Sequence, residues 1–320
     1  MPRDVQTSSL SVLRLIQFRA GYNLPVHVAV EMGHFARYGL QVDVTYTPGS
    51  LPLLEGLKAG QFEIGYAAAD DLVAEVERPR GWGVHEPDLF LFLGLYSGLM
   101  SLVGAPHTRD IHALRGQALA VDAPTSGFVF VLHKMLQARG VAPADYHVVA
   151  VGGWERRLHA LVAGHCAATL LTPPYVGEAL EAGCHLLARA DEMLPAYQAT
   201  CGIARRRWAR ENADLLVRYI RAYVEATRWC FDPQHRQACL GLLMRHHGIT
   251  RSAAAQTLAA LVDVQNGLAP NAALNLPGLT VVLALRAEMG YLSPPVPPPE
   301  KYVDLSYYRR AVGTEQERRR

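Results

Sequence analysis

A repeated order of strands and helices, about a hundred residues apart, constrains the fold of this chain more than any other feature. The first copy comprises strands at 12–18, 42–46 and 62–69, with helices that end at Gly39 and at Gly60 between them. The second copy comprises strands at 118–121, 147–151 and 167–171, with helices at 128–139 and 154–163. Such alternation predicts an α/β protein with two similar lobes.

The remainder of the chain predicts a helical return to the first lobe. An apolar stripe begins near Leu215, and further helices are expected at 237–247, 252–266 and 279–289. We therefore expect lobe 1 at 12–97, lobe 2 at 98–200, a return to lobe 1 at 201–292, and a proline-rich arm with a basic tail at 293–320. The prolines of 293–299 require extended backbone, and Glu315–Arg320 is expected to be disordered.

Composition excludes two classes of function. The 320 residues are half apolar, and 31 basic against 29 acidic side chains leave a net charge of +2. No basic stripe with interleaved aromatics is present, which argues against a nucleic-acid partner. The longest apolar stretch, Leu89–Gly104, is interrupted by glycines and serines and is too short for a membrane-spanning helix.

Localisation is left open by the first residues and by the cysteines. The segment Met1–Ser9 contains no apolar core of the kind that a secretory signal needs. We expect a periplasmic protein if a signal peptide is missing from this sequence, and a cytoplasmic one otherwise. The five cysteines form no CxxC motif, so we expect buried thiols rather than a zinc or redox site.

The predicted ligand site lies at the strand ends, because open α/β sheets bind ligands beyond the carboxyl ends of their strands. The loops there offer hydroxyl, amide, carboxylate and aromatic side chains, namely Tyr22, Asn23, Ser50, Asp70, Asp71, Thr125, Ser126, Thr172 and Tyr175. Helix starts at these loops suit an anionic or strongly polar group. The alternative is that Ser50, Thr125 and Ser126 only cap helices.

Asp70 and Asp71 allow three interpretations. They can cap the next helix, accept hydrogen bonds from a ligand amine or amide, or act as general acid and base. Tyr22, Tyr175 and Trp154 can stack on a ring or can simply pack in the core. The 13 histidines have no metal-ligand spacing, and no hydrolase, protease or nucleotide-binding motif occurs, so neither a metal nor a cofactor is expected.

Several blocks of the chain resemble ABC-transporter substrate-binding proteins of the NMT1/THI5-like, sulfonate/nitrate/taurine group. Residues 26–42 are similar to an A–x–E–x–G–x–F–x–x–x–G–L–x–V block, and 57–65 to L–x–x–G–x–x–D–I–G with Glu63 in place of Asp. Further similar segments are 111–116, 161–164, 172–175 and 301–308. The resemblance covers more than nine-tenths of the chain.

The resemblance implies a periplasmic-binding-protein type II fold, with two βα lobes joined by a hinge, and an ABC permease as partner. Pyrimidine synthases of thiamine biosynthesis are similar as well, but they carry a lysine and a histidine after the second strand. Residues 66–71 here contain neither. We therefore expect a solute-binding protein for a small polar or anionic organic nutrient. The alternative is a cytoplasmic enzyme or ligand sensor on this fold, with Asp70 or Asp71 as base.

Overall fold

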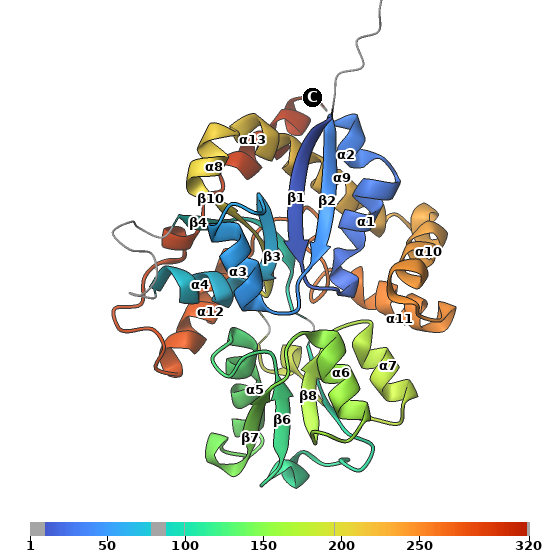
Figure 1. The fold of residues 1–320 in the computed structure, drawn as a ribbon, viewed down its shortest axis with the longest axis vertical. Helices are drawn as coiled ribbons and strands as arrows, with labels where there is room; N and C mark the ends of the chain where they lie inside the picture. The colour runs from blue at the N-terminus through green and yellow to red at the C-terminus, as the bar shows by residue number, and fades with distance from the viewer. Residues whose placement is uncertain (1–9, 78–87, 99, 195, 319–320) are drawn as a thin grey trace, which may run out of the picture.

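Two five-stranded mixed sheets form the centres of the two lobes (Figure 1). The computed structural model describes residues 10–77, 88–98, 100–194 and 196–318. The first sheet has the order β2-β1-β3-β10-β4, built from β1 (Ser11–Gln17), β2 (Leu40–Tyr46), β3 (Ile64–Ala68), β4 (Leu89–Tyr96) and β10 (Thr200–Arg205). The second has the order β7-β6-β8-β5-β9, built from β5 (Ser101–Gly104), β6 (Ala118–Val121), β7 (His147–Ala150), β8 (Ala168–Leu171) and β9 (His185–Arg189).

The two sheets repeat one topology. In each, three strands are parallel, and the fourth strand in the order is antiparallel to both of its neighbours. That fourth strand comes from a segment at a crossing between the sheets: β5 follows the first crossing, and β10 follows the second. The chain therefore passes between the lobes twice, and the strand that follows each crossing completes the sheet it enters. The two lobes are thus joined at two adjacent points.

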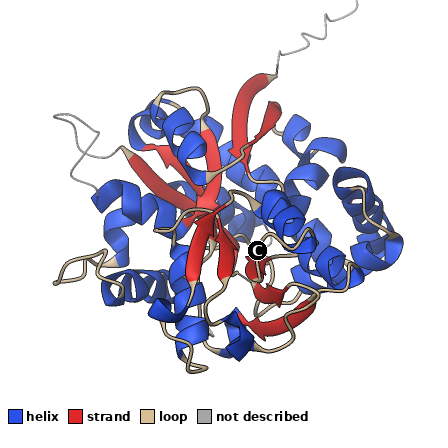
Figure 2. Ribbon diagram, turned by 60° about the horizontal axis from the view of Figure 1, so that its bottom comes forward, coloured by secondary structure: helices blue, strands red, loops and turns tan. Residues whose placement is uncertain are grey.

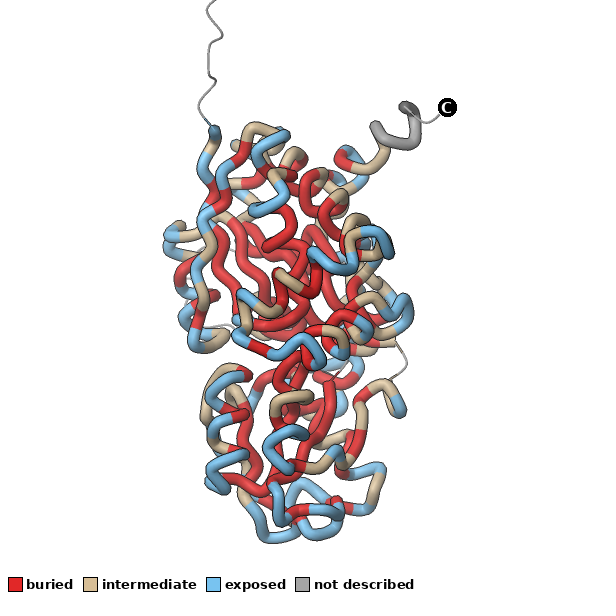
Figure 3. The backbone as a smooth tube through the Cα atoms, turned by 90° about the vertical axis from the view of Figure 1, so that its right-hand side faces the viewer, coloured by how far each residue is buried: buried red, intermediate tan, exposed pale blue. Residues whose placement is uncertain are grey.

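Helices cover both sheets, and the buried residues concentrate inside each lobe (Figures 2 and 3). The helices of the two repeats are α1 (Leu24–Glu31), α2 (His34–Arg37), α3 (Ser50–Lys58), α4 (Ala69–Glu77), α5 (Gly127–Gln137), α6 (Trp154–Val162) and α7 (Tyr175–Glu181). The helical return comprises α8 (Arg206–Glu211), α9 (Ala213–Phe231), α10 (Arg236–His247), α11 (Arg251–Leu261), α12 (Leu276–Glu288) and α13 (Ser306–Arg318). Through α11 and α12 this return also contacts α7 and α5 of the second lobe.

Several predicted elements need correction. The helix predicted to end at Gly39 is two helices, because Gly33 has a φ of 74° and interrupts it. The stretch Leu89–Gly104 contains two strands, and β4 is buried along its whole length, which explains its continuous apolar pattern. The strands β9 and β10 were not predicted.

The predicted disordered tail is also wrong as far as Arg318. Helix α13 packs against α9, and its Tyr307 and Ala311 are buried. Tyr307 and Ala311 precede the predicted tail, and its residues 315–318 continue the same helix. The first nine residues, on which the localisation argument depended, and residues 319–320 lie outside the described part of the chain.

Candidate functional site: a cleft between the lobes

The loops after the parallel strands of both sheets meet at the junction of the lobes. Gly153 N, after β7, donates to Pro48 O, after β2, at 3.2 Å. Gly21 N, after β1, donates to Pro173 O, after β8, at 3.1 Å. The strand-end rule therefore brings both sets of loops to one interface, where a ligand can contact both lobes.

A cleft of about 400 Å³ lies between these loops. Lobe 1 contributes Ser50, Leu54 and other residues of the Pro48–Leu54 loop and helix start, and also Asp71 and Glu75 of α4. Lobe 2 contributes Asp122, Ala123, Thr125, Ser126, Gly152 and Arg156. This volume is in the range of small-molecule sites, and the lining combines apolar walls with a few polar groups.

Asp71 and Asp122 bring carboxylates to the cleft from opposite lobes. The Ser50 hydroxyl donates to Asp122 Oδ2 at 2.6 Å, which links lobe 1 to lobe 2. Burial raises the pKa of Asp71 well above its ordinary value, and the charges of Asp122 and Asp70 raise it further, while hydrogen bonds from Ala68 and Ser50 oppose the shift. The cleft thus holds one carboxyl group whose ionisation is disfavoured by its surroundings.

Asp70 lies beside Asp71 but has a different environment. Its Oδ2 accepts a hydrogen bond from Arg286 Nη1 of α12 at 2.8 Å, and both side chains are buried. Burial raises the pKa of Asp70, and the Arg286 guanidinium opposes that shift. Its carboxylate also packs against Gly127, at the start of α5 in lobe 2, where the Gly127 backbone lowers the pKa of Asp70. Asp70 therefore joins α12, α4 and α5 rather than lining the cleft.

A narrow aromatic recess of about 10 Å³ continues inward from the cleft and shares Asp71, Asp122 and Ser126 with it. Its other walls include Phe18, Tyr22, Phe128, Trp154 and Arg157. The Arg157 guanidinium stacks on the Trp154 ring at 4.2 Å, and its Nη1 donates to Leu170 O at 3.0 Å. Burial lowers the pKa of Arg157 to about 10, and Asp122 opposes this shift.

The structure separates the predicted site residues into two groups. Those that line the cleft or its recess are Tyr22, Ser50, Asp71, Thr125 and Ser126. Those that hold the lobes or loops together are Asn23, Asp70, Thr172 and Tyr175. In this second group Asn23 Nδ2 donates to Phe18 O, Thr172 Oγ1 donates to Tyr96 Oη at 3.3 Å, and Tyr175 Oη donates to Arg19 O at 2.9 Å.

The predicted capping roles need correction. Gly49 occupies the N-cap of α3, and Ser50 makes no capping hydrogen bond because its hydroxyl donates to Asp122 instead. Ser126 does occupy the N-cap of α5, but its side chain makes no capping bond and its Oγ has no partner among the described residues. The Ser50 hydroxyl therefore points to lobe 2, and Ser126 lines the cleft and its recess.

Sequence reasoning missed Asp122, Arg157 and Arg286. Asp122 is the first residue after β6, and the strand-end rule that selected residues 125–127 could have included it. Arg157 is one helical turn after Trp154, and nothing in that spacing distinguishes it from a surface arginine. Arg286 is 216 positions from its partner Asp70, so only the tertiary structure reveals the pair.

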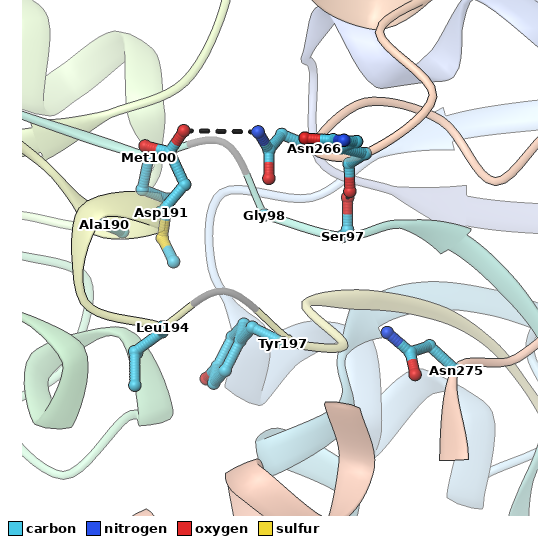
Figure 4. Close-up of a pocket in the computed structure, with 10 residues that line it drawn as sticks. Ser97, Gly98, Met100, Ala190, Asp191, Leu194, Tyr197, Asn266 and Asn275 are labelled. Carbon is cyan, nitrogen blue, oxygen red and sulfur yellow. Dashed lines mark hydrogen bonds between the residues drawn. The ribbon is translucent and has the colours of Figure 1, made fainter. Parts of the chain in front are cut away.

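A second recess, of about 20 Å³, lies at the two crossings between the lobes (Figure 4). Asn266 Nδ2 donates to Asp191 Oδ2 at 3.2 Å across it, and Ser97 Oγ donates to Gly267 O at 3.0 Å. The Asn266–Asp191 bond connects the two lobes next to the crossings, and the Ser97–Gly267 bond lies within lobe 1. The recess is small, and we assign it to the hinge region rather than to ligand binding.

Metal-binding and membrane-spanning features were sought in the described residues. Within 10–77, 88–98, 100–194 and 196–318, no group of three or more His, Cys, Asp or Glu side chains is placed to hold a metal ion. The same residues include no helix long and apolar enough to cross a membrane. All five cysteines are buried thiols, so their predicted burial is confirmed.

Comparison with known proteins agrees with this architecture. The profile of a family described as NMT1/THI5 like matches residues 21–236. The chain belongs to the NMT1/THI5-like family. A relative from Brachyspira hyodysenteriae, named as a putative ABC transporter periplasmic binding protein, is 24% identical over a 239-residue alignment that covers 70% of this chain. The match spans 65% of the length of that relative.

Solved structures establish the fold of this family member. The periplasmic nitrate-binding protein NrtA of Synechocystis PCC 6803 superposes with a TM-score of 0.80 at 13% identity, covering 95% of this chain and 89% of that one. The alkanesulfonate-binding protein SsuA of Xanthomonas axonopodis pv. citri, bound to MOPS, superposes with a TM-score of 0.71 at 18% identity. The match covers 92% of this chain and 96% of that one. The desulfurization enzyme DSZB superposes with a TM-score of 0.63 at 14% identity, and the match covers 96% of this chain and 99% of that one. The predicted periplasmic-binding-protein type II fold is confirmed.

Proposed function

We propose that this protein is the solute-binding component of an ABC import system and holds a small polar organic solute between its lobes. The observation that carries the proposal is the cleft of about 400 Å³, lined by Ser50 and Asp71 from one lobe and by Asp122 and Ser126 from the other. A solute in this cleft contacts both lobes, so it can stabilise their closed arrangement.

The division into lobes supports this function. We assign residues 12–97 and 201–292 to one lobe and 98–200 to the other, with the crossings near Ser97 and Thr200 as the hinge. Hinges absorb large backbone changes at a few loop positions, and both crossings here are loops that lie next to the recess of Figure 4. Family membership supports a membrane permease as partner and a periplasmic location.

A thermal-shift screen tests the proposed function. Small amines, amidines, carboxylates, sulfonates and nitrate are each added to the purified full chain. A ligand present at about one hundred times its dissociation constant stabilises the native state by about 2.7 kcal/mol, which raises the melting temperature by several degrees. Ser50→Ala and Ser126→Ala should weaken the response. A screen without any stabilising compound contradicts the proposal.

An enzyme on the same fold is the second candidate, since the fold also occurs in a desulfurization enzyme. The observation that favours it is the environment of Asp71, whose raised pKa suits a general acid. The ion pair with Arg286 leaves Asp70 poorly placed to act as a base. Incubating a stabilising compound with the protein separates the candidates, because an enzyme consumes the compound and a binding protein returns it.

A further inference from the structure

Asp71 and Asp122 form a pair of cleft carboxylates without an ion-pair partner among the described residues. The other cleft carboxylate, Glu75, is neutralised by Lys58, whose Nζ lies 2.8 Å from its Oε1. The Ser50 hydroxyl has one proton, which it donates to Asp122, and it also lies within reach of Asp71. Two acidic groups thus share one hydroxyl donor in a confined space.

The nearby arginines leave this pair exposed to a ligand. Arg157 is only 3% exposed, stacks on Trp154 and donates through Nη1 to Leu170 O, and its Nε, which has no hydrogen-bond partner among the described residues, remains a donor at the back wall of the recess. Arg156 is exposed at the mouth of the cleft, where water screens its charge. Neither arginine makes a salt bridge to Asp71 or Asp122 in the described part of the chain.

The helix start that would suit an anion is already occupied. A positive N-terminus of α5 faces the interface, but the carboxylate of Asp70 packs against its Gly127 backbone. A Cβ atom at Gly127 would lie only 2.4 Å from Asp70 Cβ, so no space remains there for a ligand anion. The carboxylate of Asp70, from lobe 1, therefore takes the position at the start of α5 that a ligand anion would otherwise occupy.

Ser126 supplies an independent sign that the pair faces a ligand. Its side chain is 7% exposed, lines both the cleft and the recess, and its Oγ has no hydrogen-bond partner in the described structure. A buried hydroxyl without a partner costs free energy, which a bound molecule can recover. Ser126 Oγ can accept a hydrogen bond from a further N–H of a head group whose other N–H donors reach the two carboxylates.

We infer that the cleft selects a solute with a cationic nitrogen head group, an ammonium or an amidinium, which binds between Asp71 and Asp122. This inference rests on the proposed function and adds the charge of the solute to it. An ammonium or amidinium carries several N–H donors and can serve both carboxylates and Ser126 Oγ together. Apolar residues of the cleft and the aromatic recess then contact the uncharged part of the solute.

The test uses compounds that share a carbon skeleton and differ in the head group. Primary amines and amidines, for example benzylamine and benzamidine, are compared by calorimetry with benzyl alcohol, benzoate, benzenesulfonate and nitrate. We expect binding only by cationic members, and a loss of affinity of about tenfold or more in Asp71→Asn and in Asp122→Asn. Glu55→Gln, which removes a carboxylate of α3 outside the cleft, should leave the affinity unchanged.

The outcomes separate the two proposals. Binding by anions alone, unaffected by Asp71→Asn, overturns the cationic head group but leaves a solute-binding protein. Binding by cations that is equally strong in Asp71→Asn, Asp122→Asn and wild-type protein also overturns it, because the cation then lies elsewhere. Absence of binding by every compound of the wider screen contradicts the proposed function itself.

Discussion

Two regions of the lobe interface, side by side along α4, contain acidic residues with opposite surroundings. In the region around Asp70, the carboxylate is buried against Arg286 of α12 and the start of α5, and no cleft space adjoins it. In the region around Asp71, the carboxylate adjoins a cleft of about 400 Å³ and a second carboxylate, Asp122. We propose that the first region maintains the structure and that the second binds the solute.

Removing Arg286 should change the stability of the protein more than the other substitutions considered below. Arg286→Met leaves Asp70 buried without its counterion, and we expect the free energy of unfolding to fall by about 3–5 kcal/mol. Urea denaturation followed by circular dichroism measures the change. The double variant Asp70→Asn with Arg286→Met, which removes both charges, should recover much of the loss. A double variant as unstable as the single one would show that packing, rather than the charge pair, stabilises this region.

Neutralising Asp71 should increase the free energy of unfolding, whereas removing Arg286 should decrease it. Asp70 and Asp122 face it as negative charges and Arg157 lies behind Asp122, so Asp71→Asn removes an unpaired acid and should stabilise the ligand-free protein by about 1–3 kcal/mol at pH 7. The folded state raises the pKa of Asp71, so it binds a proton that the unfolded chain releases. Wild-type stability should therefore fall relative to the variant as the pH rises above about 4.

Melting curves of both proteins between pH 4 and pH 8 measure this dependence. The two curves should lie closest together near pH 4, where the folded-state carboxyl is protonated and the carboxyl of the unfolded chain is only about half ionised. A variant that is less stable at every pH would contradict the view that Asp71 lacks a favourable partner in the empty protein.

The sequence predicted the two-lobed α/β fold because strand and helix periodicity and glycine stops are local signals. It also predicted Ser50, Asp71, Thr125 and Ser126 as cleft residues, since the ends of parallel strands share one edge of a sheet. It could not distinguish Asp70 from Asp71, which are adjacent and chemically identical. Their difference depends on Arg286, which is 216 positions from Asp70 and contacts it only through tertiary packing.

Tyr175→Phe should have the smallest effect on stability. It removes the hydroxyl that donates to Arg19 O across the lobes, and we expect a loss of about 0.5–1.5 kcal/mol together with weaker ligand binding, because the closed arrangement loses one bond. Tyr146→Phe is the matched control, since its hydroxyl pairs with His133 inside lobe 2. Stability should fall in both variants, whereas affinity should change only in Tyr175→Phe. If Tyr175→Phe binds the ligand as tightly as the wild-type protein, the Tyr175 bond is present both with and without ligand.

Recovery of a bound solute tests the central claim, that the cleft binds without reacting, most directly. A compound that stabilises the protein is incubated with it for a day at several times the protein concentration, and native mass spectrometry and chromatography then measure stoichiometry and amount. We predict one molecule per chain and complete recovery of the unchanged compound. Consumption of the compound that stops in Asp71→Asn, while binding persists, would contradict the claim and establish an enzyme.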